Sequence, residues 1–498
     1  MTIKLYEQLK KNLEKYHPPR DPQLKTVKWL ADNWEEYRIF CLNAPVGTGK
    51  SDIAVAVQDL FPNTVIITPN NNLVDQYGDS FDFLNLLKGK DNYSCFADSD
   101  CGTCYKNMKK YCKGCPYLAA RTRAEIGDPT IANPMSYFYN VRKDNISPAT
   151  VLVVDEAHTL ASFIRSIFTT KLSFEDVRWN KADLKDLASL TAFLRKQEDK
   201  VAKLAELKRK NKEDAEKEDA LVTRISKVAW AIGEDPSVWF FYESDDYHKG
   251  KVLNIECLYP PKYVLDVFMK SNKIILMSGT LFPNHIKELV GDTPYTYLSL
   301  PSIIPKENRK VLCWPAAQQV NASTPPEVFA AKIKQIIGAN PGKQGIIHAT
   351  YKMGEQLLEL LKHLNVQGNN KTNKNEVLER FKRKEFQWLM ACGMSEGVDL
   401  PGDLGEVNVI CKMQFPYLKD AFVEKRMKLP DGQLWYSAAA LLHLVQATGR
   451  TNRGPTDKSV TYILDPNANR CMDTIERLAG KDTDKYIPPY FKEAFFNV

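Results

Sequence analysis

The chain has 498 residues, which is enough for roughly three domains at about 150 residues each, and its 44% hydrophobic share is ordinary for a soluble protein. No uninterrupted apolar stretch approaches the roughly 18 residues of a membrane span, and the segment from Met1 to Arg20 lacks the apolar core of a secretory signal. We therefore expect a cytoplasmic protein that is not secreted and has no membrane partner, while a net charge of +7 is too small to indicate a partner by itself.

Short apolar strands alternate with helices along the first part of the chain. Strands are predicted from apolar or β-branched runs at 38–42, 64–68, 151–154 and 273–277, and helices at 51–60 and 70–83. Strands separated by helices indicate a parallel, doubly wound α/β sheet, which binds ligands at the carboxyl ends of its strands. A glycine-rich loop, an acidic pair and a Ser-Gly-Thr sequence each follow one of these strands, so we expect them to converge.

Two segments interrupt this alternation. Residues 87–123 hold five cysteines in a short polar stretch. Within residues 161–270, the stretch at 174–235 is rich in Lys, Glu, Ala and Leu and predicts a helical hairpin. The run of charged residues at 196–219 is interpreted as the solvated face of long helices. The alternative is a surface that binds nucleic acid.

A second alternating region begins near residue 301. Strands are predicted at 344–348, 387–391, 407–411 and 459–464, with helices at 353–364, 374–384 and 436–446. The chain therefore divides into two sheet domains. The first comprises 1–86, 124–160 and 271–300, interrupted by insertions at 87–123 and 161–270, and the second comprises 301–498.

The glycine-rich loop has the context of a phosphate-binding loop, because it follows a strand and opens a helix. Its glycines let main-chain N–H groups turn toward phosphates, and the helix N-terminus adds positive potential. Lys50 is expected to reach the β- and γ-phosphates of ATP and Ser51 to ligate Mg²⁺. The general pattern has glycine where this chain has Ala44, and the alternative is a glycine turn that precedes a lysine by chance. The sequence of the loop is Ala44-Pro45-Val46-Gly47-Thr48-Gly49-Lys50-Ser51.

An acidic pair and an arginine pair complete the candidate catalytic set. Asp155 can hold Mg²⁺ and Glu156 can activate the attacking water, while His158 either takes part or only braces the loop. Arg450 and Arg453 follow a predicted helix in the second domain. If that domain docks on the first, these arginines reach the γ-phosphate as arginine fingers, and the alternative is a basic surface turn.

These elements together resemble a superfamily 2 helicase of the XPD/DinG-like iron–sulfur family. The resemblance extends in order from Arg20 to Pro466 and implies nucleotide contacts by Gln23, which would read adenine, and by Asp399 and Gln446. The further matching segments are Arg20-Asp21-Pro22-Gln23, Thr68-Pro69 with Gln76, Ser278-Gly279-Thr280-Leu281, Ser395-Glu396-Gly397-Val398-Asp399 and Leu464-Asp465-Pro466.

The clustered cysteines indicate a metal, since a long chain without a signal peptide crowds cysteines more often for a metal than for disulfides. The resemblance implies a 4Fe-4S cluster on Cys95, Cys101, Cys104 and Cys115, with Cys112 as an alternate ligand, and Cys115 is followed by Pro, Tyr and a nearby arginine as in the family. Two Cys-x-x-Cys pairs also suit zinc, which stays the alternative. Unliganded surface thiols are the third interpretation.

The resemblance implies two RecA-like P-loop domains, the first with an iron–sulfur insertion and a helical arch, and a monomer that is cytoplasmic or associated with the nucleoid. The function it implies is an ATP-dependent DNA helicase that moves 5′→3′ on single-stranded and forked DNA. Alternatives are an ATP-dependent translocase or RNA helicase, and a metal-bearing scaffold for nucleic acid with an inactive ATPase.

Overall fold

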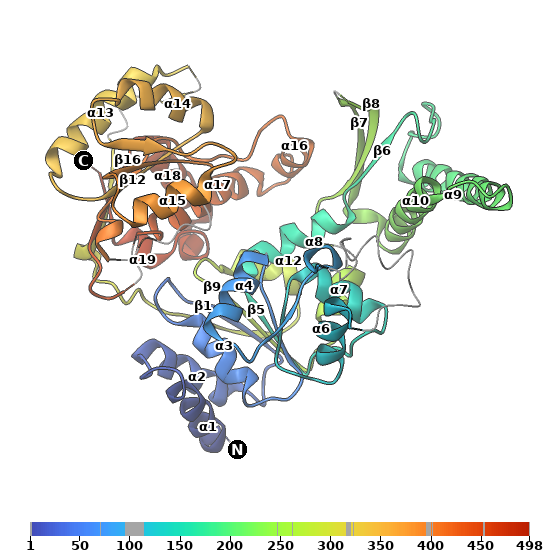
Figure 1. Cartoon of the computed structure of the whole chain (residues 1–498), viewed down its shortest axis with the longest axis horizontal. Coiled ribbons are helices and arrows are strands. Elements are labelled where there is room, and N and C mark those ends of the chain that lie inside the picture. The colour runs from blue at the N-terminus through green and yellow to red at the C-terminus, as the bar shows by residue number, and fades with distance from the viewer. Residues whose placement is uncertain are drawn as a thin grey trace.

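A computed structural model describes residues 2–69, 71–94, 114–246, 248–260, 262–314, 320–321, 323–394, 400, 402–451 and 454–497. Figure 1 shows two α/β domains and a projection of helices and strands that rises from the first of them. No helix within these ranges is long and apolar enough to cross a membrane. The two-domain α/β class predicted from the sequence is confirmed.

Within the described residues, the first domain is built on a sheet of seven parallel strands in the order β10-β1-β9-β5-β2-β4-β3. Its central strands are continuous apolar runs because helices cover both faces of the sheet. The strands are β1 (Ile39–Asn43), β2 (Thr64–Ile67), β3 (Asn85–Leu87), β4 (Thr130–Ala132), β5 (Val151–Asp155), β9 (Lys273–Ser278) and β10 (Tyr295–Ser299).

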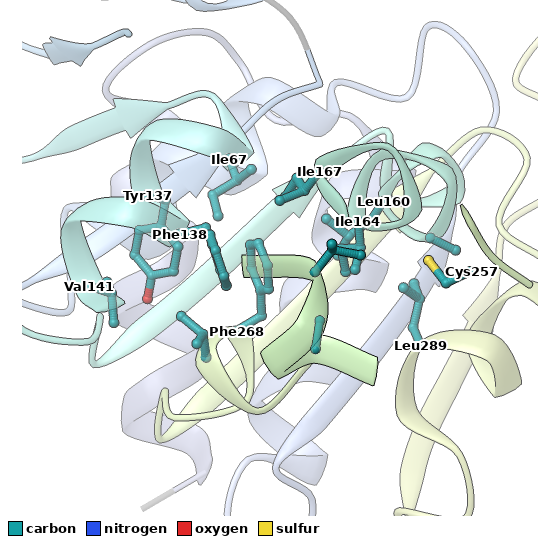
Figure 2. Packing of buried hydrophobic residues seen from close by; sticks show 14 of the residues in the cluster. Ile67, Tyr137, Phe138, Val141, Leu160, Ile164, Ile167, Cys257, Phe268 and Leu289 are labelled. Atoms are coloured by element: carbon teal, nitrogen blue, oxygen red, sulfur yellow. The ribbon is translucent and has the colours of Figure 1, made fainter. Parts of the chain in front are cut away.

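Helices pack on the two faces of this sheet and create two cores. They are α1 (Thr2–Glu14), α2 (Asp21–Asn33), α3 (Lys50–Gln58), α4 (Asn71–Ser80), α6 (Pro116–Glu125), α7 (Pro134–Arg142), α8 (Leu160–Phe168), α11 (Lys262–Phe268) and α12 (Pro283–Val290). Successive residues of one strand enter different cores, as Val153 and Val154 of β5 do. In the core that contains Val154, the rings of Phe138 and Phe268 stack with centroids 6.2 Å apart (Figure 2).

The described part of the second domain contains another sheet of seven parallel strands, in the order β13-β14-β12-β15-β16-β11-β17. Its strands are β11 (Arg309–Cys313), β12 (Gly345–Ala349), β13 (Val366–Gly368), β14 (Trp388–Cys392), β15 (Val407–Ile410), β16 (Ser459–Ile463) and β17 (Phe495–Asn497). Its helices are α13 (Pro326–Ala339), α14 (Tyr351–Leu360), α15 (Lys374–Lys382), α16 (Ala421–Met427), α17 (Gly432–Thr448), α18 (Asn467–Ala479) and α19 (Pro489–Lys492).

The insertion between α8 and α11 is a helical hairpin on a small sheet. The hairpin of α9 (Leu187–Lys210) and α10 (Glu216–Glu234) agrees with the sequence prediction. The prediction was wrong in making the whole stretch at 174–235 helical and in omitting the antiparallel sheet at its root, which pairs β6 (Thr170–Ser173), β8 (Gly250–Cys257) and β7 (Trp239–Asp246). Ion pairs such as Lys208–Glu218 and Lys210–Glu206 cover the charge run, which fits a solvated face.

The two domains touch at the base of this projection. The guanidinium of Arg165 on α8 lies 4.6 Å from the ring centre of Phe422 on α16. Arg426, also on α16, lies 5.9 Å from the ring of Tyr259. Both contacts are cation–π interactions, which attract a guanidinium to the face of an aromatic ring and so favour this placement of the domains.

Candidate nucleotide site between the two domains

A cleft of about 1000 Å³ opens between the two domains. The first domain contributes the glycine-rich loop and the acidic pair to its walls, and the second contributes Gln446 and Arg450. These residues are about 400 positions apart in the chain, and the carboxyl ends of the parallel strands bring them together. The structure therefore assembles most of the predicted ATP-site residues at one place.

The glycine-rich loop has the backbone that a phosphate site requires. Gly47 and Gly49 have φ of 84° and 78°, values that residues with a side chain rarely adopt. Gly49 is the N-cap of α3, so the loop leads into a helix N-terminus. Lys50 Nζ donates to the carbonyl oxygen of Ala44 at 3.1 Å, which folds the lysine back over the loop.

Residues at the N-terminus of α2 hold this loop through hydrogen bonds. The Arg20 guanidinium donates to the carbonyl oxygen of Gly47. Gln23 is 3% exposed; its Nε2 donates to the carbonyl oxygen of Gly49 at 3.2 Å and to Asp52 Oδ2 at 2.8 Å. Gly49 has a φ of 78°, and a Cβ on it would lie 2.2 Å from Gln23 Nε2, so a side chain there would be strained and would displace Gln23. Gln23 holds the loop in place, and its adenine contact stays a prediction.

The acidic pair sits at the end of β5. Tyr77 donates its hydroxyl to Asp155 Oδ2 at 3.0 Å, and the main-chain N–H of Glu156 donates to Asp155 Oδ1 at 2.9 Å. Burial and the charge of Glu156 raise the pKa of Asp155 to about 6. Oxygen donors from the buried Asp155 and the half-buried Ser51 suit Mg²⁺, which is commonly held by one or two carboxylates together with substrate phosphates. The residues present therefore fit this cation.

A chain of hydrogen bonds joins Glu156 to the second domain. Ser278 Oγ donates to Glu156 Oε2 at 2.9 Å and lies 2.7 Å from His158 Nδ1. His158 Nε2 in turn lies 2.7 Å from Gln446 Nε2, which is a donor only. In this arrangement His158 Nε2 accepts from Gln446, and the Nδ1 side of the ring faces Ser278. His158 does more than brace its own loop, because it links the two domains.

The segment after α17 places Arg450 at the cleft. Asn408 Nδ2 donates to the carbonyl oxygen of Ala447 at 3.0 Å, and Thr451 Oγ1 donates to Ser459 Oγ at 3.0 Å. All of these groups except Arg450 are buried, so they fix the turn that carries it. The predicted residues that lie outside the described part of the chain are Arg453, Asp399, Cys95, Cys101, Cys104 and Cys112.

His348 lies at the end of β12, is 8% exposed, and should make folding pH-dependent. Burial and the charge of Arg450 lower its pKa from 6.5 to about 4. The unfolded chain then binds a proton first, so stability falls as the pH drops from about 6.5 to about 4, by about 3 kcal/mol for this group. Urea unfolding of His348→Gln should lose this part of the pH dependence, whereas the exposed His363→Gln should keep it. Equal slopes in all three proteins would contradict the assignment.

Comparisons with known proteins agree with this architecture. Residues 333–478 match the helicase C-terminal domain family. An XPD helicase structure is 16% identical, with a TM-score of 0.62 over 96% of this chain and 99% of that chain. Apo XPD is 15% identical with a TM-score of 0.56, covering 100% and 99%, and S. tokodaii Xpd4 is 15% identical with a TM-score of 0.57, covering 96% and 100%. A comparison with curated proteins finds no match.

The chain thus has the fold of the XPD helicases, and its second domain carries a helicase C-terminal domain. A domain of this family implies an enzyme that uses ATP and Mg²⁺. The residues that sequence reasoning missed are Arg20 as a support of the loop, Tyr77 on Asp155, and Tyr490, which also lines the cleft. A single aromatic or basic residue gives no pattern that would mark its contact with a distant element.

Proposed function

We propose that this protein is an ATP-dependent helicase that moves along single-stranded DNA. The observation that carries the proposal is the hydrogen bond between Gln446 and His158, because it ties the second domain to Glu156 through Ser278. A contact of this kind makes the position of one domain depend on the state of the nucleotide site in the other. The helicase C-terminal domain at 333–478 supports the same function.

In the proposed mechanism, ATP lies between the domains. Lys50 and the main-chain N–H groups of its loop hold the phosphates, and Ser51 and Asp155 would hold Mg²⁺, which would neutralise charge on those phosphates. Glu156 orients and activates the attacking water. Arg450, with Arg453, stabilises the charge of the transition state from the opposite domain. Closure of the cleft and its reopening after hydrolysis move the strand by a hinge motion.

DNA as the substrate and 5′→3′ movement rest on the resemblance to the XPD/DinG-like family. Strand contacts are proposed to be mostly to phosphates with some aromatic stacking, and therefore independent of sequence. Forked duplexes of DNA and of RNA, each with only a 5′ or only a 3′ single-stranded tail, test this directly. Unwinding of 5′-tailed DNA is the expected result. Unwinding of RNA alone supports an RNA helicase, and nucleic-acid-stimulated ATP turnover without strand separation supports a translocase.

The metal insertion is proposed to hold a 4Fe-4S cluster as a rigid wedge beside the DNA path. The described residues contain one of its five cysteines, Cys115, which is the N-cap residue of α6. Protein purified without oxygen should be brown and contain about four irons per chain. Cys115→Ser should lose the colour, whereas replacing the buried Cys257 by serine should keep it. Zinc without iron in the native protein would contradict the 4Fe-4S cluster. It would not contradict the proposed ATP-driven movement along DNA.

The protein is further proposed to act as a monomer in the cytoplasm or on the nucleoid. Light scattering on the purified chain gives the mass, which should be near 56.7 kDa. A scaffold with an inactive ATPase is the second candidate function, and failure of any nucleic acid to stimulate ATP turnover would favour it.

A further inference from the structure

Tyr490 reaches from the second domain into the first. Its hydroxyl donates to the carbonyl oxygen of Gly279 at 2.9 Å. Gly279 is the middle residue of the Ser278-Gly279-Thr280 sequence that follows β9, whereas Tyr490 lies on α19 near the end of the described chain. This contact and the one between Gln446 and His158 are thus two separate hydrogen bonds from the second domain to the same part of the first.

The backbone of Tyr490 is held tightly in the second domain. Pro488 and Pro489 precede it and restrict the chain, and the next residue, Phe491, is 2% exposed in the core. The Arg309 guanidinium donates to the carbonyl oxygen of Tyr490, and its Nε donates to the carbonyl oxygen of Ile304 at 2.8 Å. Ile304 lies in the connection between the two sheets, so Arg309 joins that connection to the Tyr490 segment.

The acceptor of this hydrogen bond is packed against the phosphate loop. A Cβ on Gly279 would lie 3.4 Å from the carbonyl oxygen of Ala44 and 4.0 Å from Lys50 Nζ. The main-chain N–H of Ala44 donates to the carbonyl oxygen of Ser278 at 2.8 Å. Since the Ser278 hydroxyl also contacts Glu156, a shift of this strand end acts on the loop and on the acidic pair together.

The chemistry of the contact suits a bond that forms and breaks. Burial raises the pKa of Tyr490 well above its usual value, so the phenol stays protonated and remains a donor. The bond joins a neutral hydroxyl to a carbonyl, and a single neutral hydrogen bond contributes little enough to be broken in each cycle. Phenylalanine would keep the ring and its packing and would remove only this bond.

We propose that Tyr490 is a positioning residue that couples the nucleotide site to the movement of the second domain through the carbonyl group of Gly279. The inference rests on the proposed helicase function and adds a residue to its mechanism. The bond stabilises the contact between the two domains, and its loss leaves ATP hydrolysis in place while less of that hydrolysis drives movement.

The experiment compares Tyr490→Phe with Tyr297→Phe. The Tyr297 hydroxyl donates to the carbonyl oxygen of Leu281 at 3.1 Å, so the control loses a matching bond beside the same sequence, but within one domain. Tyr490→Phe should keep most of kcat and raise the KM for ATP by up to roughly five-fold, and the number of base pairs unwound per ATP at saturating ATP should fall roughly five-fold. Tyr297→Phe should keep all three quantities near their native values.

Unwinding per ATP at the native level in Tyr490→Phe would overturn the inference, and so would equal losses in both variants. A second readout does not need unwinding, because small-angle X-ray scattering reports closure of the domains on titration with a non-hydrolysable ATP analogue. Tyr490→Phe should shift the midpoint of closure to a roughly five-fold higher concentration, and Tyr297→Phe should not. An unshifted midpoint would overturn the inference as well. A native protein that closes but never unwinds contradicts the proposed function only.

Discussion

Replacing Arg450 by alanine should lower kcat for ATP hydrolysis by roughly 10³-fold or more, with little change in the KM for ATP. Arg450 lines the cleft from the second domain and follows α17 in a turn fixed by Asn408. An arginine in this place meets the γ-phosphate only when the domains close, so it stabilises the transition state more than it stabilises bound ATP. Steady-state hydrolysis with saturating single-stranded DNA is the measurement.

Two further variants sharpen this test. Arg450→Lys keeps the positive charge but loses the planar, bidentate guanidinium, so its kcat should lie between those of Arg450→Ala and the native protein. Arg470→Ala removes an exposed arginine on α18 of the same domain and should keep the native rate. Native turnover in Arg450→Ala would show that this residue is no arginine finger.

Glu156→Gln should lower kcat by roughly 10²- to 10⁴-fold, because glutamine keeps the shape of the side chain but cannot accept the proton of the attacking water. Glu156 has a φ of 50° and accepts a hydrogen bond from Ser278 Oγ at 2.9 Å, so its carboxylate is held in one position. Burial raises the pKa of Glu156, but the hydrogen bonds with His158 and Ser278 and the nearby positive charge, including that of Lys50, together lower it to about 2.

Binding of a fluorescent ATP analogue separates catalysis from affinity in this variant. Glu156→Gln should bind the analogue at least as well as the native protein, since only the chemical step is impaired. The matched control is Glu125→Gln, which alters an exposed carboxylate at the end of α6. A native rate of ATP turnover in Glu156→Gln would show that Glu156 does not activate the attacking water.

The predicted strands were correct to within one residue, whereas the helices predicted at 353–364 and 436–446 miss the ends of α14 (Tyr351–Leu360) and α17 (Gly432–Thr448) by up to four residues. The run at 151–154 became β5 (Val151–Asp155), and that at 273–277 became β9 (Lys273–Ser278), because strands buried on both faces are continuous apolar runs. β10 (Tyr295–Ser299) was missed because it lies at the edge of its sheet and is only half-buried. Strands of three residues such as β3 (Asn85–Leu87) are too short to show a period.

The candidate site was predictable as a set of motifs but not as a network. The motifs around Lys50 and Asp155 require fixed spacings within one loop, and such spacings are visible in a sequence. The partners of these residues come from distant elements, as Tyr77 does for Asp155 and Tyr490 does for Gly279. Those contacts depend on tertiary packing and on how the two domains meet, and neither leaves a local pattern.

The most direct measurement is ATP hydrolysis by protein purified without oxygen, with and without single-stranded DNA, beside Lys50→Ala. A lysine that holds the phosphates contributes to the transition state, so its loss should cost roughly 10²-fold or more in turnover. An ATP-driven motor on DNA predicts turnover that the strand stimulates and that disappears in the variant. Turnover that DNA leaves unchanged, or that survives in Lys50→Ala, would contradict it.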